Sequence, residues 1–556
     1  MLSSIHASVQ LTVYYSPFPP IPEGPYPPLY EFITTNWKPH GGYLSDKIAI
    51  LDGSTGLQRT FADHYKNTSG IAAALIKDMG VCENSTLAMY CPNHVDYLPV
   101  ALAVSLSGAK MTPINPLYTA DELERVLDLS QSSVLFVHTS KLDVGLDAAR
   151  RSKYVKHVVV ITDDGEAIPG GTIDLDTLKR REGGLNETVA IVHKNTASHP
   201  FLIPYSSGTT GLPKGVCLSH NNILANLLQI EEAEGIAFPS HHKLISPLPF
   251  FHIYAFTVSL LYSAWKGQQL ITMSKRFDLE DFCKLVQKHR PERAHLVPPI
   301  LLGLQKSHLV DSIDLSSLQM ISSAAAPLSS VTEEIVKKRI GSGVKQLWGM
   351  SELSPAGTFT SDFHIKPGSI GPVVSSTFAK IIDVHGNSLG PNEPGELLIK
   401  GPQVMMGYLN EEEKTAECLS QSGWLRTGDV AQYDEDGFLF ITDRVKELIK
   451  VRGFQVAPAE LEALLLTHDA ISDAAVIQVN DEDSGELPRA YVVLNDTEDS
   501  RGVNEIDIYE WVKERVAPYK RLDGGVVFTD SIPKSASGKI LRRILRDQVK
   551  TENENP

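Results

Sequence analysis

Residues 205–215 read Tyr-Ser-Ser-Gly-Thr-Thr-Gly-Leu-Pro-Lys-Gly, a stretch rich in glycine and hydroxyl side chains. Its glycines let the backbone turn so that successive N–H groups converge on an anion, while hydroxyl groups and a lysine add donors. Apolar segments at 201–205 and 215–218 favour a strand–loop–strand unit around the β- and γ-phosphates of a nucleotide. The phosphate-binding candidates are Ser206, Ser207, Gly208, Thr209, Thr210, Gly211 and Lys214.

Two other interpretations compete for this stretch. By composition alone, a Ser/Gly-rich surface turn is the stronger alternative. A Walker loop fits poorly, because Lys214 lies between Pro213 and Gly215 and does not open a helix.

The bulk composition narrows the class of protein. At 556 residues the chain exceeds what one hydrophobic core usually serves, which predicts at least two domains. A formal charge of -16 argues against a nucleic-acid partner. The five cysteines show neither zinc nor disulfide spacing, so we expect reduced thiols in a cytoplasmic protein. No apolar run reaches the length of a transmembrane helix, no signal peptide or C-terminal peroxisomal tripeptide is recognised, and import into an organelle stays open. Monomer and homodimer also both stay open.

Strand-like and helix-like stretches alternate up to about residue 440, which favours α/β layers with largely parallel sheets. Apolar runs at 99–109 and 255–265 are expected to be buried helices. The last part looks like a separate α+β unit, in which Pro458 occupies the first position of a helix. We therefore expect an N-terminal domain at 1–442, a hinge at 443–446 and a small C-terminal domain at 447–556.

The stretch 205–216 resembles the signature loop of the adenylate-forming enzymes. This family includes acyl-CoA synthetases, 4-coumarate–CoA ligases, firefly luciferases and peptide-synthetase adenylation domains, and the resemblance extends over residues 16–548. It implies a large N-terminal AMP-binding domain of layered α/β subdomains with a β-barrel-like part, and a small mobile C-terminal α+β domain. It also implies a carboxylic acid, ATP, Mg²⁺ and coenzyme A as ligands, with Thr209 as one metal contact.

Residues 346–352 read Gln-Leu-Trp-Gly-Met-Ser-Glu, where relatives usually carry Gln-Gly-Tyr-Gly-Met-Thr-Glu. The resemblance places an aromatic ring on adenine, a hydroxyl near the α-phosphate and a carboxylate on Mg²⁺, which are Trp348, Ser351 and Glu352. The other nucleotide contacts of this segment are Gln346, Leu347, Gly349 and Met350. Leu347 replaces a glycine beside the aryl ring of 4-coumarate ligases, so we expect it to narrow the acyl pocket. In isolation, the same stretch would be taken for a helix start capped by Ser351.

Three segments are assigned to the acid by the same resemblance. Residues 322–328 line the acyl and adenine pockets, with Ala324 at a glycine position and Ala325, Ala326 and Pro327 on the nucleotide; a small-residue turn is the alternative for each. In Pro-Phe-Phe-His-Ile-Tyr (249–254), His252 is placed beside the substrate carboxylate and Tyr254 in the aryl pocket, although a lone histidine after an apolar run is usually a core residue. Pro355 and Ala356 are further acid contacts, and Lys306 is a weaker match to a pocket residue.

The ribose and the small domain complete the expected site. Asp429 and Arg444 match the family's ribose contacts, and Lys446 matches its hinge; alone, Asp429 would be a turn residue. Lys539 matches the lysine that reaches the site during adenylation, where its charge offsets that of the α-phosphate. Lys450 and Gln455 match residues that approach for the thioester step, with Arg452, Gly453 and Phe454 on coenzyme A. A basic surface helix is the interpretation adopted for Arg542, Arg543 and Arg546.

The motifs at 249–254, 453–466 and 532–543 are most similar to 4-coumarate–CoA ligases, which predicts a hydroxycinnamate or another planar acid. A medium- or long-chain fatty acid is the alternative, because Leu347 and Ala324 depart from the pocket of the plant enzymes. Luciferase-like oxidation and a non-catalytic nucleotide-binding scaffold are less favoured alternatives.

Overall fold

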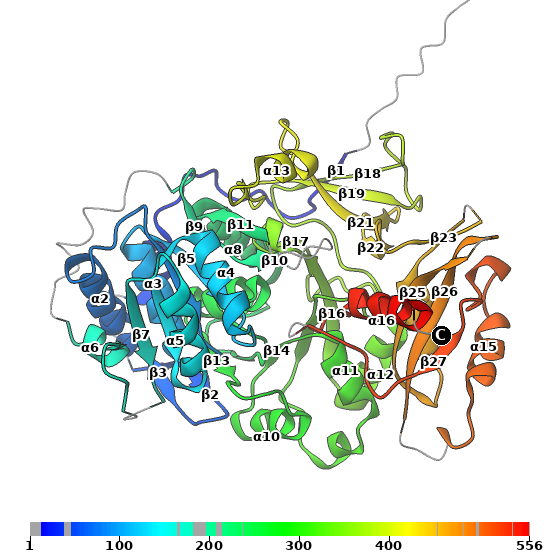
Figure 1. Ribbon diagram of the computed structural model, residues 1–556, viewed down its shortest axis with the longest axis horizontal. Coiled ribbons are helices and arrows are strands. Elements are labelled where there is room, and N and C mark those ends of the chain that lie inside the picture. Colours follow the sequence, from blue (N-terminus) through cyan, green and yellow to red (C-terminus); the bar gives the residue numbers. More distant parts are fainter. Residues whose placement is uncertain are drawn as a thin grey trace, which may run out of the picture.

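The computed structural model describes residues 13–37, 46–163, 167–181, 196–206, 214–235, 237–452, 454–481, 483–495, 500–535 and 538–554. Four β-sheets organise this part of the chain. Figure 1 shows two helix-covered sheets in the large lobe, a sheet above them, and a smaller lobe formed by the C-terminal residues. The short α1 (Leu29–Thr34) follows the proline-rich stretch at 16–28.

The first sheet has the order β10-β11-β9-β5-β4-β6-β7-β8, with β20 paired to β11. Strands β9, β5, β4, β6, β7 and β8 are parallel, whereas β11 runs antiparallel to β9, β10 and β20. Its strands are β4 (Thr86–Tyr90), β5 (Lys110–Ile114), β6 (Ser132–His138), β7 (His157–Ile161), β8 (Ile173–Asp174), β9 (Pro200–Leu202), β10 (Tyr205–Ser206), β11 (Lys214–Ser219) and β20 (Gly407–Tyr408). The helices in this part of the sequence are α2 (Phe61–Lys77), α3 (Tyr97–Leu106), α4 (Ala120–Ser130), α5 (Leu142–Arg151), α6 (Leu175–Lys179) and α8 (His220–Glu234).

The second sheet has the order β17-β16-β15-β14-β12-β13-β2-β3 and is parallel from β16 to β2. Its strands are β2 (Ile48–Asp52), β3 (Gln58–Thr60), β12 (Lys243–Ile245), β13 (Gln269–Thr272), β14 (Arg293–Leu296), β15 (Met320–Ser323), β16 (Gly343–Gly349) and β17 (Ala356–Phe359). The helices between these strands are the π-helix η4 (Tyr254–Leu261), α9 (Tyr262–Lys266), α10 (Leu279–His289), α11 (Pro298–Lys306) and α12 (Ser330–Ile340).

The third sheet is antiparallel throughout, in the order β1-β18-β19-β21-β22, and is the barrel-like part of the fold. Its strands are β1 (Tyr14–Tyr15), β18 (Phe378–Ile382), β19 (Gly395–Lys400), β21 (Leu425–Tyr433) and β22 (Leu439–Arg444), with helix α13 (Glu412–Cys418) between β20 and β21. The fourth sheet has the order β24-β23-β26-β25, with β27 beside β26. It contains β23 (Ile449–Val451), β24 (Phe454–Val456), β25 (Ile471–Asp481), β26 (Gly485–Leu494) and β27 (Val526–Phe528), with helices α14 (Pro458–Leu465), α15 (Glu505–Lys513) and α16 (Arg542–Glu554).

Local sequence explains where several of these elements begin. Ser219 is the last residue of β11 and caps α8, because its hydroxyl accepts the Asn222 N–H while the Asn222 side chain accepts the Ser219 N–H. Pro458 occupies the first turn of α14, where its missing N–H costs nothing. Helix α3 is buried on every side, and η4 and α9 are largely buried, as the apolar runs predicted.

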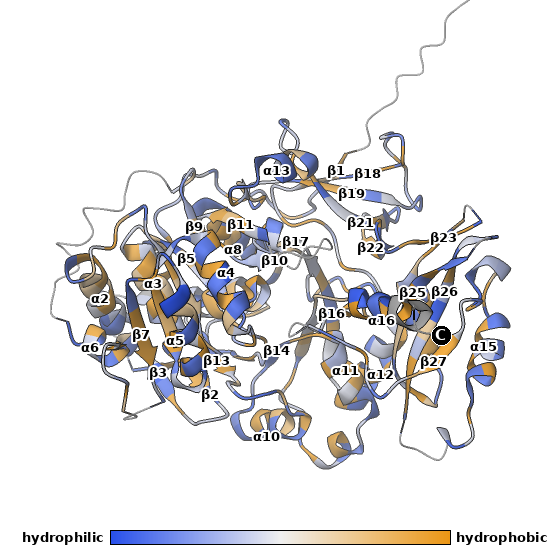
Figure 2. Ribbon diagram, viewed as in Figure 1, coloured by the Kyte–Doolittle hydropathy of each residue, from blue (hydrophilic) through white to orange (hydrophobic). Residues whose placement is uncertain are grey.

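The buried apolar side chains of the described residues form a large and a smaller cluster in the first 440 residues and two further clusters among residues 449–545. Figure 2 shows apolar residues concentrated on the strands and on the inner faces of the helices. All five cysteines are free. The helices of the described ranges include none that is long and apolar enough to cross a membrane. The expected fold class, layered α/β with a barrel-like sheet and a small α+β domain, is confirmed.

Candidate active site

The phosphate-loop candidates lie at the β10–β11 hairpin, where Ser206 pairs with Lys214 across the two strands. Residues 207–213 lie outside the described ranges, so the predictions for Ser207, Gly208, Thr209, Thr210 and Gly211 stay predictions. The two flanking strands expected from the sequence are present and pair with each other.

Lys214, Tyr408 and Glu352 lie together beside this hairpin. The Lys214 Nζ atom is 4.8 Å from the centroid of the Tyr408 ring, and the Tyr408 hydroxyl donates a hydrogen bond of 2.8 Å to Glu352 Oε1. Burial, followed by the Glu352 carboxylate, raises the pKa of Tyr408, so the phenol keeps its proton and donates. Tyr408 was not predicted; its only local signal is its place after Gly407, on the short strand that pairs with β11.

Asp429 contacts two other residues that the sequence predicted for the nucleoside, Arg444 and Trp348. It lies opposite Arg444 on β21 and β22, and the Arg444 Nε atom is 3.0 Å from Asp429 Oδ1. The Trp348 indole N–H donates to Asp429 Oδ2 at 2.9 Å. A carboxylate offers about four lone-pair sites, so two of them remain for hydroxyl donors of a bound molecule.

Gln346 holds the backbone of the segment at 322–328. Its amide oxygen accepts the Leu328 N–H at 3.1 Å, and its nitrogen donates to the Leu328 carbonyl at 2.8 Å and to Glu333 Oε1 at 2.6 Å. These hydrogen bonds direct the Gln346 side chain toward the 322–328 segment, so that Gln346 positions the backbone of this segment. Glu333 was not predicted, and the sequence carried no signal for it. Within the loop, Ala325 has a φ of 76°, a left-handed conformation that is costly for a residue with a Cβ.

Gly349, at the end of β16, is required by a close backbone approach. A Cβ atom at this position would lie 2.1 Å from the Pro355 carbonyl oxygen. That carbonyl accepts the Met350 N–H at 3.0 Å, and Ala356 is fixed by two hydrogen bonds with the Asn226 side chain. The turn that carries Ser351 and Glu352 is therefore held by backbone contacts. It is a 3₁₀ turn, η6 (Ser351–Leu353), after a strand.

The residues assigned to the acid lie on or next to strands and helices of the second sheet. His252 lies just before η4, and its Nδ1 atom accepts the Tyr254 N–H at 3.3 Å. Burial, followed by the charge of Lys539, lowers the pKa of His252 to about 4, so the imidazole is neutral at pH 7. The Tyr254 hydroxyl donates to the Ser322 carbonyl at 3.4 Å. Ala324 and Leu347 are both buried, with relative exposures of 7% and 6%.

Lys539 is directed at the same region from the small domain. Burial lowers its pKa to about 8, the positive Arg444 adds to this, and Asp429 opposes it. The preceding Gly538 has a φ of 80°, and a Cβ atom there would lie 3.2 Å from Pro299 of α11. Lys539, His252, Asp429 and Arg444 are thus brought together although they come from four separate segments.

Lys306 does not have the environment expected for a pocket residue. Its ammonium group donates to the Ile471 carbonyl of the small domain at 2.6 Å. The lysine therefore connects α11 to β25, a role that depends on the docking of two domains and has no local sequence signal.

The thioester candidates are exposed in this arrangement. Lys450 and Gln455 face each other across the β23–β24 hairpin, and both side chains are exposed. Phe454 is 56% exposed and stacks on Tyr519 at a centroid distance of 4.6 Å. The Arg452 Nε atom donates to Ser484 Oγ at 3.1 Å, and Gly453 lies outside the described residues.

The junction between the domains follows β22. This strand includes Asp443 and Arg444, so the strand ends inside the span expected for the hinge. Val445 donates its N–H to the Gly428 carbonyl at 2.9 Å, and the next residue, Lys446, is exposed.

The interpretation of α16 as a basic surface helix holds for Arg543 and is wrong for Arg542. The Arg542 guanidinium is largely buried and makes two hydrogen bonds to Glu462, at 2.7 and 2.8 Å. Arg546 is partly buried and lies 3.2 Å from Glu447. Glu462 on α14 is the partner of Arg542, whereas Glu447, the partner of Arg546, precedes β23; the sequence did not show that these segments lie beside α16.

Comparison with known families identifies two matching models. Residues 41–409 match the model described as AMP-binding enzyme, and residues 460–539 match the AMP-binding enzyme C-terminal domain. The chain is 36% identical over 518 residues to a probable 4-coumarate–CoA ligase 1 of Dictyostelium discoideum, covering 90% of this chain and 92% of that one. It is 38% identical over 516 residues to 4-coumarate–CoA ligase 5 of Oryza sativa subsp. japonica, covering 91% and 92%.

Solved structures show the same fold. The anthranilate CoA ligase AuaEII in complex with anthranoyl-AMP superimposes with a TM-score of 0.85 at 23% identity, covering 96% of this chain and 99% of that one. ATP-bound MatB from Rhodopseudomonas palustris gives a TM-score of 0.80 at 25% identity, covering 94% and 98%.

Proposed function

Since the chain belongs to the AMP-binding enzyme family and is an ATP-dependent acid–CoA ligase, we propose that the acid it activates is a hydroxycinnamate. The observation that carries this proposal is the similarity to 4-coumarate–CoA ligases, at 36–38% identity over about nine-tenths of each chain. A fatty acid is the second candidate, because Leu347 and Ala324 add apolar bulk to the region assigned to the acyl group.

In the first half-reaction the acid carboxylate attacks the α-phosphorus of ATP, and pyrophosphate leaves. Asp429 and Arg444 hold the ribose, and Trp348 contributes a flat face for the adenine. Lys539 approaches the α-phosphate as its charge grows, where a fixed ammonium group stabilises the transition state more than the ground state. His252 is neutral, since its pKa is about 4, and serves as a hydrogen-bonding partner of the substrate carboxylate without adding charge.

Glu352 is suited to hold the Mg²⁺ that accompanies ATP. Its carboxylate offers the hard oxygen ligands that Mg²⁺ prefers, and the Tyr408 hydroxyl orients it. The bound ion would neutralise charge on the phosphates and assist departure of pyrophosphate. Lys214, beside Tyr408, supplies a further positive charge to the same phosphates.

In the second half-reaction the thiol of coenzyme A attacks the acyl-adenylate carbonyl, and AMP leaves. Lys450 and Gln455 are exposed on the small domain while Lys539 faces the site, so a rotation about the segment near Lys446 is needed to exchange them. Arg452, Gly453 and Phe454 are then available to coenzyme A. The hinge and the domain limits at 442 and 447 are part of this proposal.

The test is a pyrophosphate-release screen over cinnamic, hydroxycinnamic and benzoic acids and over saturated fatty acids of short, medium and long chain. The screen is run with and without coenzyme A. We expect the highest kcat/KM with a hydroxycinnamate, and formation of its CoA thioester when coenzyme A is present. A kcat/KM at least tenfold higher for a fatty acid would replace the proposed substrate by the second candidate.

A further inference from the structure

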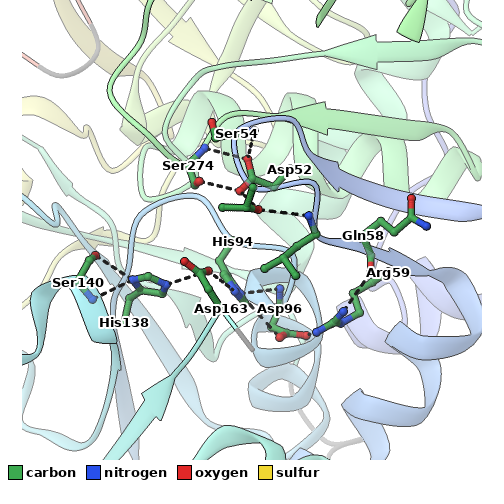
Figure 3. Close-up of polar contacts among 12 residues, drawn as sticks. Asp52, Ser54, Gln58, Arg59, His94, Asp96, His138, Ser140, Asp163 and Ser274 are labelled. Carbon is green, nitrogen blue, oxygen red and sulfur yellow. Dashed lines mark hydrogen bonds and ion pairs between the residues drawn. The ribbon is translucent and has the colours of Figure 1, made fainter. Parts of the chain in front are cut away.

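A group of three potential metal ligands, none of them among the residues assigned to ATP, lies at one edge of the first sheet. His94 follows β4, His138 is the last residue of β6, and Asp163 follows β7. These strands are adjacent and parallel, so their carboxyl ends meet at the same edge, where open α/β sheets commonly bind ligands. Figure 3 shows the Asp163 carboxylate between the two imidazoles.

The ligand atoms are close enough to share one ion. Asp163 Oδ1 lies 3.5 Å from His94 Nε2 and 3.3 Å from His138 Nε2, and all three atoms lie within 4.8 Å of one another. Zinc bonds of about 2.0–2.1 Å in tetrahedral geometry place neighbouring ligand atoms about 3.3–3.4 Å apart. Two of the three separations already have nearly this value, so a small rotation of one imidazole would complete the set.

His94 has an unsatisfied nitrogen inside this group. Its side chain is 2% exposed, and its Nε2 atom makes no hydrogen bond of ordinary geometry to the described residues. A buried polar atom without a hydrogen bond is unfavourable, and a bound ion would remove that cost. Asp163, with its side chain 38% exposed, leaves an approach from solvent.

Oxygen atoms lie beside the other nitrogen of each imidazole. When Nε2 binds a metal, Nδ1 must carry the proton and needs an acceptor. For His138 the Ser140 hydroxyl lies 2.8 Å from Nδ1, and a proton on Nδ1 would exchange the hydrogen bond that it now accepts from the Ser140 N–H, at 3.2 Å, for one to this hydroxyl. For His94 the Asp96 Oδ2 atom lies 3.8 Å from Nδ1, and Lys179 fixes that carboxylate at 2.6 Å. The proton shift on His94 would exchange the hydrogen bond that Nδ1 now accepts from the Asp96 N–H for one to the Asp96 carboxylate.

From this geometry we infer that His94, His138 and Asp163 form a binding site for a divalent transition-metal ion, with Zn²⁺ as the expected ion. Two imidazoles and one carboxylate suit zinc, cobalt or nickel, whereas Mg²⁺ and Ca²⁺ prefer oxygen ligands alone. Three protein ligands leave a fourth position for water. Glu352 is not one of these ligands, so the proposed ion is distinct from the Mg²⁺ that accompanies ATP.

The site is connected to the segment that carries His252. Asn93, next to His94, accepts the Phe250 N–H at 2.7 Å and donates to the Leu248 carbonyl at 2.9 Å. It also donates to Thr272 of β13 at 2.8 Å. An ion on His94 would therefore restrain the contact between the two large sheets and the segment leading to His252.

The experiment is a Co²⁺ titration of the full chain after treatment with a chelator, in the absence of nucleotide. We expect one equivalent of Co²⁺ to bind with the intense visible absorption of a tetrahedral centre, and Zn²⁺ to displace it. Asp163→Asn and His138→Gln should each weaken binding by about tenfold or more. Ser140→Ala, which removes only the acceptor behind His138, should weaken it by about tenfold.

His308→Gln is the matched control, because this histidine is fully exposed and lies outside the group. It should leave Co²⁺ binding unchanged. Circular dichroism and thermal melting without metal check that each variant folds; if one does not, the remaining two decide. The inference is overturned if the wild-type chain shows no saturable tetrahedral Co²⁺ signal, or if the folded variants bind Co²⁺ as the wild type does. In either case Asp163 is only a polar neighbour of the two imidazoles.

Discussion

Replacing Lys539 by arginine should abolish a decline of adenylate formation at alkaline pH that the wild-type chain shows. Burial and Arg444 lower the pKa of Lys539 from 10.5 to about 8. The protonated form is the active one, so activity is present below this pKa and lost as the pH rises through it. The charged fraction falls from about 90% at pH 7 to about 10% at pH 9, which predicts an approximately tenfold fall of kcat/KM. Arginine stays charged throughout this range, so Lys539→Arg should show no such fall, whatever its absolute rate.

The lowered pKa of Lys539 gives domain docking the opposite pH dependence: docking becomes more favourable as the pH rises. Without ATP, bringing a protonated Lys539 to its docked position costs about 3 kcal/mol, because its pKa is about 8 there and 10.5 for a lysine in water. This cost is complete below pH 8 and disappears as the pH rises toward 10.5. Phosphates of bound ATP raise the pKa again, so kcat should decline at higher pH than kcat/KM does.

The assay measures the two half-reactions separately. Adenylate formation is followed as pyrophosphate release from ATP and acid without coenzyme A, and thioester formation is followed from supplied acyl-adenylate and coenzyme A. Lys539→Ala should lower adenylate formation by about 10²–10³-fold and change thioester formation only a few-fold. His252, with a pKa of about 4, does not titrate between pH 7 and pH 9. The reasoning is refuted if Lys539→Ala impairs both half-reactions equally, or if Lys539→Arg keeps the tenfold alkaline fall.

Three further substitutions test other parts of the site. Lys450→Ala should show the reverse pattern, a loss of thioester formation with adenylate formation kept within about twofold in the same two assays. Lys306→Met removes the hydrogen bond to the Ile471 carbonyl and should lower kcat/KM for adenylate formation by about tenfold, since a charged hydrogen bond contributes about 1.5–3 kcal/mol. The control is Lys288→Met, which changes an exposed lysine and should leave kcat/KM unchanged. Leu347→Ala should lower the free energy of unfolding by about 2–5 kcal/mol, as measured in a denaturant titration. It should also raise the kcat/KM of bulkier acids relative to smaller ones. An unchanged acid preference would exclude Leu347 from the pocket.

Much of the architecture followed from short-range features of the sequence. The start of α14 at Pro458 and the buried helix around residue 100 were both predicted from local patterns. Such patterns depend on neighbours within a few positions, which hydrophobic periodicity and capping chemistry report directly. The family-specific motifs placed Asp429, Arg444 and Trp348 on one ligand, and the structure brings these three side chains into contact.

Other features were decided only by the tertiary structure. Lys306 was expected in a pocket and instead binds the small domain, and Arg542 was expected in solvent and instead pairs with Glu462. Tyr408 acquires its partner Glu352 only because β20 lies beside β11. Contacts of this kind depend on strand order and on how two domains dock, and no local pattern encodes either.

The sequence by itself thus determined the family and the class of chemistry, through the loop at 205–215 together with the motifs that follow it, because residue types and their spacing are carried along the chain. The positions of Lys539 over the site and of His94 beside His138 and Asp163 depended on folding. Residues distant in the sequence meet there only when parallel strands end at one edge or two domains close on each other.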